Sequence, residues 1–212
     1  MTELDHIAVV APSLAAGIAH VHDVLGVEPA QGGAHPQMGT LNHLLRLGDD
    51  VFLEVIAVDP AAPRPAHRRW FGLDDQAALE QRWRDGRRLG CYVARCNDVT
   101  QTIGTRGDLF GAPMRLSRGD RTWTFGVRAD GELPLGGALP HLMNWGERGN
   151  PARTMPDYGL ALRELVIETP DADAVQAALD AIGMIHKPTI RRGSAVRLSA
   201  HIETPHGVRM LK

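Results

Sequence analysis

The chain has 212 residues, a formal net charge of −2 and a hydrophobic content of 43%, an ordinary composition for a globular protein with a core of normal size. The near-neutral charge does not favour nucleic acid as a partner, and no apolar run approaches the roughly 20 residues of a membrane span. The acidic start "MTELDH" is unlike a signal peptide, and the two cysteines lack the spacing of a zinc site or the number needed for a disulfide framework. We therefore expect a cytoplasmic protein with no nucleic-acid partner and no membrane partner.

The first predicted element is a buried strand over residues 4–12, "LDHIAVVAP", in which His6 interrupts a nearly continuous apolar run. An unpaired polar group buried in a sheet costs roughly 1 to 3 kcal/mol, so this imidazole must find a hydrogen-bond partner, a metal or water. Ser13 can then cap a helix over residues 13–25, which Gly26 can end. The first unit is thus a strand followed by a helix.

A hairpin follows, because residues 40–47 ("TLNHLLRL") and 51–58 ("VFLEVIAV") read as two strands around the turn "GDD". Glu54 lies inside the second apolar run, where a carboxylate is costly unless it is paired, protonated or functional. We interpret Glu54 as functional. Asn42 is a polar residue in the first of the two strands.

The strand-helix unit recurs twice along the chain. Residues 162–183 ("LRELVIETPDADAVQAALDAIG") repeat it clearly, and residues 89–104 ("LGCYVARCNDVTQTIG") repeat it more weakly. In this alignment His6 corresponds to Cys91 and to Glu164. A second predicted hairpin, "RTWTFGVR" with "GALPHLMNW", has a register that places Asn144 opposite Glu54.

We therefore predict an α+β fold built from a repeated unit of strand, helix and strands. The first module covers residues 1–58 and the second covers 88–146, and a partial third module covers 160–212. The connection over residues 59–87 is rich in Pro and Arg and contains a short helix near "DDQAALEQRW", and a second linker covers 147–159.

The segments "LDHIAVVAPSLAAGIAHVHDVLG", "HPQMGTLNHLLRLGDDVFLEVIA", "RRWFGL" and "PHLMNWG" resemble the glyoxalase-like branch of the vicinal oxygen chelate superfamily (glyoxalase, bleomycin resistance and dioxygenase proteins). The resemblance implies paired βαβββ modules whose mixed sheets curl around a cavity, where a divalent metal typically binds vicinal oxygens of a substrate. Its metal positions fall on His6 and Glu54 in the first module and on Cys91 and Asn144 in the second.

The implied ligands differ in quality. His6 and Glu54 offer an imidazole nitrogen and a carboxylate, which suit Zn, Mn, Ni or Fe, whereas Asn144 offers only a weak neutral oxygen. Cys91 would bind as a thiolate only if a metal or a positive neighbour lowered its pKa, and Glu164 or His141 could complete the set. In the alternative without a metal, His6 and Glu54 form a buried hydrogen-bonded pair.

Four further residues are candidates for substrate binding. Asn42 matches a position that the family tends to keep polar. Trp70 and Phe71, flanked by arginines in "RRWFGL", and Trp123 could close the mouth of a cavity and bind a ligand, although core packing is their commonest role. We place most of the other histidines, including His35 in a Gly-rich loop, at the surface.

The sequence contains no phosphate-binding loop, no acyl-transfer motif and no nucleic-acid module. Two functions remain. An enzyme would use a cavity metal as Lewis acid on a carbonyl or diol substrate while the catalytic Glu54 moves a proton, which gives isomerase, lyase or dioxygenase chemistry. A metal-free binding or resistance protein would sequester a small molecule in the same cavity. A homodimer would be one way to cover the sheet edges that paired modules leave.

Overall fold

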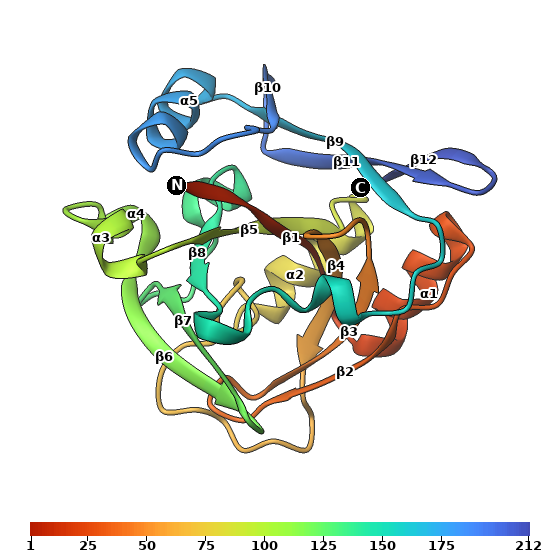
Figure 1. Ribbon diagram of the computed structural model, residues 1–212, viewed down its shortest axis with the longest axis horizontal. Coiled ribbons are helices and arrows are strands. Elements are labelled where there is room, and N and C mark those ends of the chain that lie inside the picture. The colour runs from red at the N-terminus through yellow and green to blue at the C-terminus, as the bar shows by residue number, and fades with distance from the viewer.

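The computed structural model describes all 212 residues, which form two β-sheets and five α-helices (Figure 1). The larger sheet contains β1 (Thr2–Val10), β2 (Ala30–His35), β3 (Thr40–Arg46), β4 (Phe52–Val58), β5 (Leu89–Cys96), β6 (Ala112–Arg118), β7 (Arg121–Val127) and β8 (His141–Asn144). The smaller sheet contains β9 (Ala161–Thr169), β10 (Thr189–Arg192), β11 (Arg197–Thr204) and β12 (Gly207–Leu211). The helices are α1 (Leu14–Leu25), α2 (Gln76–Arg84), α3 (Val99–Ile103), α4 (Gly107–Phe110) and α5 (Ala172–Ala181), with short 3-10 turns at Pro134–Gly137, Gly146–Arg148 and Pro151–Thr154.

The larger sheet has two similar halves. Its strand order is β2-β3-β4-β1-β5-β8-β7-β6, with β1 parallel to β4 in one half and β5 parallel to β8 in the other. The antiparallel pair of β1 and β5 joins the halves. The sheet curls so that its outermost strands, β2 and β6, approach each other at the bottom of Figure 1. This architecture confirms the predicted α+β fold with βαβββ modules in a curled mixed sheet.

The first helix has the predicted ends. Ser13 Oγ accepts a hydrogen bond from the amide of Ala16 at 3.2 Å, and Gly26 ends the helix at a φ of 73°, in the left-handed region that glycine adopts without strain. Val21 and Leu25 on its inner face are buried against the sheet. The cap signals and the apolar face in the sequence are therefore sufficient to place this helix.

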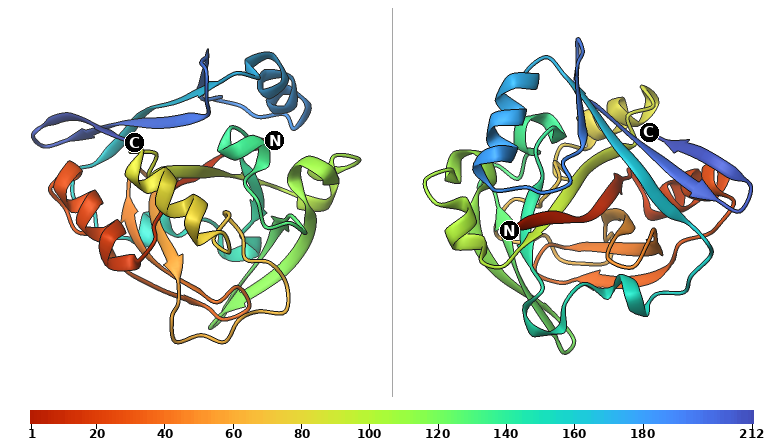
Figure 2. Two further views of the ribbon diagram at one scale, coloured as in Figure 1. Left: turned by 180° about the vertical axis from the view of Figure 1, so that it is seen from behind. Right: turned by 45° about the horizontal axis from the view of Figure 1, so that its top comes forward.

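The third unit repeats the strand and the helix but arranges its strands differently. In the smaller sheet the order is β10-β9-β11-β12, so the strand that follows helix α5 lies parallel to β9. In the first module it is the fourth strand, β4, that lies parallel to β1. The smaller sheet lies across one face of the larger one (Figure 2), and Thr2 ties the two together through hydrogen bonds with Ile182, Gly183 and Ile185.

Strand alternation divides the buried side chains into two clusters. Ile7 and Val9 face the helices and the smaller sheet, whereas Ala8 and Val10 face the concave side of the larger sheet. Cys91 on β5 faces the same concave side. The concave side therefore holds the second cluster, which surrounds a cavity. No helix is long and apolar enough to cross a membrane.

Candidate functional site

A small cavity on the concave side brings together His6, Asn42 and Glu54 from three adjacent strands. Its volume is about 30 Å³, which is room for about two water molecules. Six aromatic side chains form most of its wall, namely Phe52, Trp70, Phe71, Trp123, Phe125 and Trp145. The cavity is therefore lined mainly by aromatic and other apolar side chains, with polar groups at one end.

His6 lies between two carboxylates at the polar end. Its Nδ1 is 2.7 Å from Asp5 Oδ1, and its Nε2 is 3.5 Å from Glu54 Oε2. The first contact is a short hydrogen bond, whereas the second is longer than one. The register between β1 and β5 shifts between Leu4 and His6, so Asp5 lies at an irregularity in the strand. Such an irregularity re-aims side chains, which is how consecutive residues come into contact here.

His6 and Glu54 are charged although both are buried. Burial alone would lower the pKa of His6, but the hydrogen bond to Asp5 and the negative charges of Asp5 and Glu54 outweigh it and raise that pKa to about 9. Burial likewise opposes ionisation of Glu54, but the nearby charge of His6, helped by His35 and by the hydrogen bond from Asn42, lowers its pKa below the usual value. At neutral pH an imidazolium therefore lies between two carboxylates.

Asn42 fixes the position of Glu54. Its Nδ2 donates to Glu54 Oε1 at 2.6 Å, while its Oδ1 accepts from the amide of Gly33 at 2.9 Å. A Cβ at Gly32 would lie 2.2 Å from the same Oδ1, so only glycine allows this close approach. Asn42 is thus in the cavity, as the sequence predicts, and the adjacent glycines of β2 make room for it.

Asp5 is a member of the site that sequence reasoning missed. Its second oxygen, Oδ2, accepts from Trp145 Nε1 at 2.9 Å and from Asn150 Nδ2 at 2.8 Å, and the residue is fully buried. An acidic residue directly before a buried histidine is the only signal in the sequence, and strand alternation hides it because neighbours normally point to opposite faces.

The structure does not bring Asn144 to the cavity, and this corrects the predicted register. Met143 lines the cavity, so its neighbour Asn144 points to the other face and donates to the backbone carbonyls of Cys96 and Asn97 at 2.7 and 2.9 Å. A slip of an odd number of residues along a strand moves a side chain to the opposite face. Asn144 therefore stabilises the end of β5 and is not placed to bind a metal with His6 and Glu54.

His141 is the structural counterpart of Glu54 in the second half. In the first half Ala8 pairs with Glu54, and in the second half Val93 pairs with His141. Ala8 and Val93 are equivalent, because each lies two residues after the equivalent positions His6 and Cys91. Both ring nitrogens of His141 are buried without a hydrogen-bond partner. Burial lowers its pKa to about 3, so the imidazole is neutral, and it packs against Phe71 and Phe125.

The donor set is short for a catalytic divalent metal. Such a metal commonly has about three protein ligands, but the structure contains no group of three or more His, Cys, Asp or Glu residues that could hold one. Burial raises the pKa of Cys91 well above its usual value, which keeps the thiol protonated, and Glu164 lies on β9 in the smaller sheet. His141 is not among the residues that line the cavity. Of the implied ligands the cavity therefore supplies only His6 and Glu54, which do not fit the implied metal.

The predicted substrate-binding aromatic residues all reach the cavity. Trp70, Phe71 and Trp123 are buried and line it. His35 was expected at the surface, but it ends β2, lines the cavity, and has its pKa lowered to about 4 by burial. Sequence reasoning also missed Arg118, an edge-strand residue that no apolar pattern marks.

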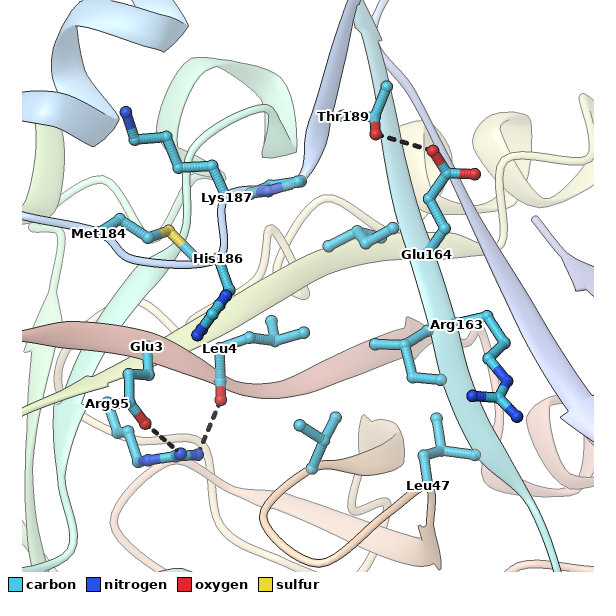
Figure 3. Close-up of a pocket in the computed structure, with 14 residues that line it drawn as sticks. Glu3, Leu4, Leu47, Arg95, Arg163, Glu164, Met184, His186, Lys187 and Thr189 are labelled. Atoms are coloured by element: carbon cyan, nitrogen blue, oxygen red, sulfur yellow. Dashed lines mark hydrogen bonds and ion pairs between the residues drawn. The ribbon is translucent and has the colours of Figure 1, made fainter.

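A larger cavity of about 510 Å³ lies between the two sheets (Figure 3). Leu4, Leu47 and Leu162 are among its apolar lining residues. Most of the charged side chains that line it have a partner within the protein: Glu3 with Arg95, Arg163 with Glu203, Lys187 with Asp180, and Glu164 with Thr189. Because these charged groups already have partners within the protein, we place the candidate site in the smaller cavity, although its volume is small.

Comparison with known proteins agrees with this fold. A hypothetical protein from Staphylococcus aureus superposes with a TM-score of 0.66 at 13% identity, covering 96% of this chain and 91% of that one. Methylmalonyl-CoA epimerase in complex with methylmalonyl-CoA and NH4+ gives 0.43 at 18% identity over 71% of this chain and 99% of that one. A variant of the epimerase from Streptomyces coelicolor, in complex with 2-nitronate-propionyl-CoA, gives 0.41 at 17% identity over 68% and 94%.

The first of these similarities shows the fold alone, and the two epimerase scores are too low to carry an argument. No curated protein sequence matches the chain. The model of the glyoxalase-like domain family, in contrast, matches residues 4–183, which is most of the chain. The protein therefore belongs to the glyoxalase-like domain family.

Proposed function

We propose that the protein is a small-molecule enzyme that moves a proton at a carbon next to a carbonyl group, which is isomerase or lyase chemistry. The observation that carries this proposal is the buried, charged row of Asp5, His6 and Glu54 at the end of an apolar cavity. Burying charged groups is expensive, and strongly shifted pKa values in a cavity are typical of catalytic groups.

The two central groups are suited to opposite roles. Glu54 is ionised at neutral pH and can accept a proton from carbon, whereas His6 is protonated and can donate to the carbonyl oxygen as negative charge develops there. Environments that push two pKa values apart commonly mark an acid and a base of one site. His6 Nε2 and Glu54 Oε2 are 3.5 Å apart. The N–H of His6 therefore has no short hydrogen bond that it would have to break before it donates to a substrate.

Asp5 acts on His6 and not on the substrate. Its hydrogen bond at 2.7 Å fixes the ring orientation and stabilises the protonated form. Trp145 and Asn150 hold Asp5 from the other side. The aromatic wall excludes water, so these electrostatic interactions act at low dielectric. A substrate larger than the cavity must displace aromatic side chains, which favours compounds with few heavy atoms.

Hydrogen-deuterium exchange tests this function without knowledge of the natural substrate. Pyruvate in D2O, followed by proton NMR, reports removal of a proton next to a carbonyl. We expect the protein to accelerate exchange of the methyl protons, and Glu54→Gln to lower the rate by about 10²- to 10⁴-fold. The matched control is Glu28→Gln at an exposed glutamate, which should retain the full rate.

The second candidate is a binding or resistance protein that sequesters a small molecule without chemistry. The aromatic lining supports it, because apolar side chains around a few polar groups are typical of sites that bind small molecules. Saturable binding of a small carbonyl compound with no exchange above the level of Glu54→Gln would favour this function and would contradict the proposed enzyme.

A further inference from the structure

Arg118, the last residue of β6, lies near Glu54 but has no carboxylate in direct contact. Its side chain is half-buried and lines the cavity, yet it forms no ion pair with any Asp or Glu. Its hydrogen-bond partner is a neutral oxygen, because Nη1 donates to Asn42 Oδ1 at 3.3 Å. A guanidinium has five N–H donors in a planar fork, so most of its capacity is unused.

The strands around Arg118 make space for it. The side chain extends from β6 to β2 across the gap where the curled sheet closes, and it lies against Gly33. A Cβ at Gly33 would come within 3.1 Å of Arg118 Cδ and 3.2 Å of Nη1. Glycine at this position therefore lets the guanidinium lie at the cavity instead of extending into solvent.

Asn42 keeps Arg118 and Glu54 apart. One end of its amide accepts from Arg118, and the other end donates to Glu54 at 2.6 Å. Because the amide lies between them, the arginine does not form an ion pair with the catalytic carboxylate. Its charge stays available to a ligand that reaches Glu54 at the same time.

A second residue at the cavity has a donor without an acceptor. Trp70 lines the cavity, and its indole Nε1 is buried without a hydrogen-bond partner. Leaving a buried donor without a partner is unfavourable. Together, Arg118 and Trp70 leave the cavity rich in unused donors, whereas the row at His6 supplies the acceptor Glu54.

We propose that Arg118 binds a carboxylate group of the substrate, so that the substrates are small 2-oxo acids. This inference rests on the proposed function, in which Glu54 removes a proton next to a carbonyl. The planar fork of a guanidinium matches a planar carboxylate in size and geometry, so two parallel N–H···O hydrogen bonds can form between them.

Fluorescence titration tests the inference by binding alone. Three of the four tryptophans line the cavity, namely Trp70, Trp123 and Trp145, and Trp83→Phe removes the fourth. The probes are pyruvate and its neutral isostere pyruvamide. We expect Arg118→Met to raise the Kd for pyruvate about 10- to 100-fold and to leave the Kd for pyruvamide unchanged. Arg115→Met, at an exposed arginine of the same strand, should change neither.

Two further variants keep the test valid if Arg118→Met fails to fold. Arg118→Lys keeps the charge but loses the fork, so the Kd for pyruvate should rise less than in Arg118→Met. Gly33→Ala adds a methyl group against the guanidinium and should weaken pyruvate binding with the charge intact. The inference is overturned if the protein does not prefer pyruvate to pyruvamide, including the case in which neither saturates, or if Arg118→Met binds pyruvate as wild type does.

The binding and exchange experiments can fail independently. Charge-dependent binding of pyruvate without proton exchange would contradict the proposed function and retain the role of Arg118. Exchange that is equally fast with pyruvate and pyruvamide would retain the function and contradict the role of Arg118. Tighter binding of methyl phosphate than of pyruvate would assign Arg118 to phosphate and contradict the 2-oxo acid class.

Discussion

The two halves of the larger sheet have the same strand order but different chemistry at equivalent positions. The first half has His6 and Glu54 on its parallel strands, and the second half has Cys91 and His141. In the first half His6 and Glu54 each have a partner of opposite charge or an amide. In the second half the thiol is protonated and the imidazole is neutral and unpartnered. The two halves therefore share a backbone arrangement but not a site, because a buried side chain stays ionised only where neighbouring groups provide opposite charge or hydrogen bonds.

The largest expected effect is on stability in the first half. His6→Leu alone should lower the free energy of unfolding by about 3 to 5 kcal/mol, because it leaves Glu54 buried without its cationic partner. Glu54→Met should cost less, because His6 keeps its hydrogen bond to Asp5. The double variant should lose less than the sum, because Glu54 is then no longer left without His6. Asp5 keeps Trp145 and Asn150 in every variant. Urea denaturation measures the free energy of unfolding of the two single variants and the double variant.

The same comparison of two single variants with their double variant, made in the second half, is the control. Cys91→Ala and His141→Leu should combine additively, because neither residue is charged or bonded to the other. Additive losses at His6 and Glu54 would show that these two residues act independently, and the contrast between the halves would then be wrong.

The next effect is on the pH dependence of stability, which should have opposite signs for His6 in the first half and His141 in the second. The pKa of His6 is raised from 6.5 to about 9, so its contribution is fully present below pH 6.5 and is lost as pH rises through about 9. The pKa of His141 is lowered from 6.5 to about 3, so stability is lost as pH falls below 6.5. Each effect is of the order of a few kcal/mol.

Melting temperatures at a series of pH values separate the two effects. The gap between wild type and the His6→Leu/Glu54→Met double variant should narrow as pH rises from about 7 to about 10. The melting temperature of His141→Leu should rise relative to that of wild type as pH falls from about 7 to about 4. His35 and Glu54 still destabilise both proteins in acid. Parallel curves for wild type and His141→Leu would mean that His141 is not held neutral by burial.

The smallest expected effect is on metal binding. Titration with Zn, Mn, Ni and Fe should show no stoichiometric binding near micromolar ion, because the structure gathers no group of three or more His, Cys, Asp or Glu side chains that could hold a metal. Elemental analysis of protein purified without added metal checks the same point. One equivalent of metal that is lost in His6→Ala would instead show that the second half completes a ligand set.

Much of the fold could be predicted because its signals are local. Ser13 and Gly26 mark one helix, and buried strands such as β1 and β4 are long apolar runs. The edge strand β2 escaped notice because "AQGGAH" is short and glycine-rich and has no alternation of apolar residues. Its glycines serve the close approach of Asn42 and Arg118, which depends on residues far away in the sequence.

The site could be predicted only in part for a similar reason. His6, Glu54 and Asn42 are polar residues in apolar strands, and that contrast is visible in the sequence. Asp5 is recognisable only once the irregularity in β1 is known. Asn144 was assigned to the cavity because β8 is too short for its sequence to define the register. Arg118 lies beside Asn42 although 76 positions separate them, a proximity that follows from the curl of the sheet.

The hydrogen bonds of Thr2 have a consequence for the order of events during synthesis on the ribosome. The strand that carries His6 is made first, but its first residues bond to Ile182, Gly183 and Ile185. Until those residues leave the ribosome, the start of β1 lacks these partners, and pairing over such a distance closes slowly. The start of β1 therefore reaches its final environment late, and a nascent chain halted before Ile182 should contain Thr2 in a less protected form.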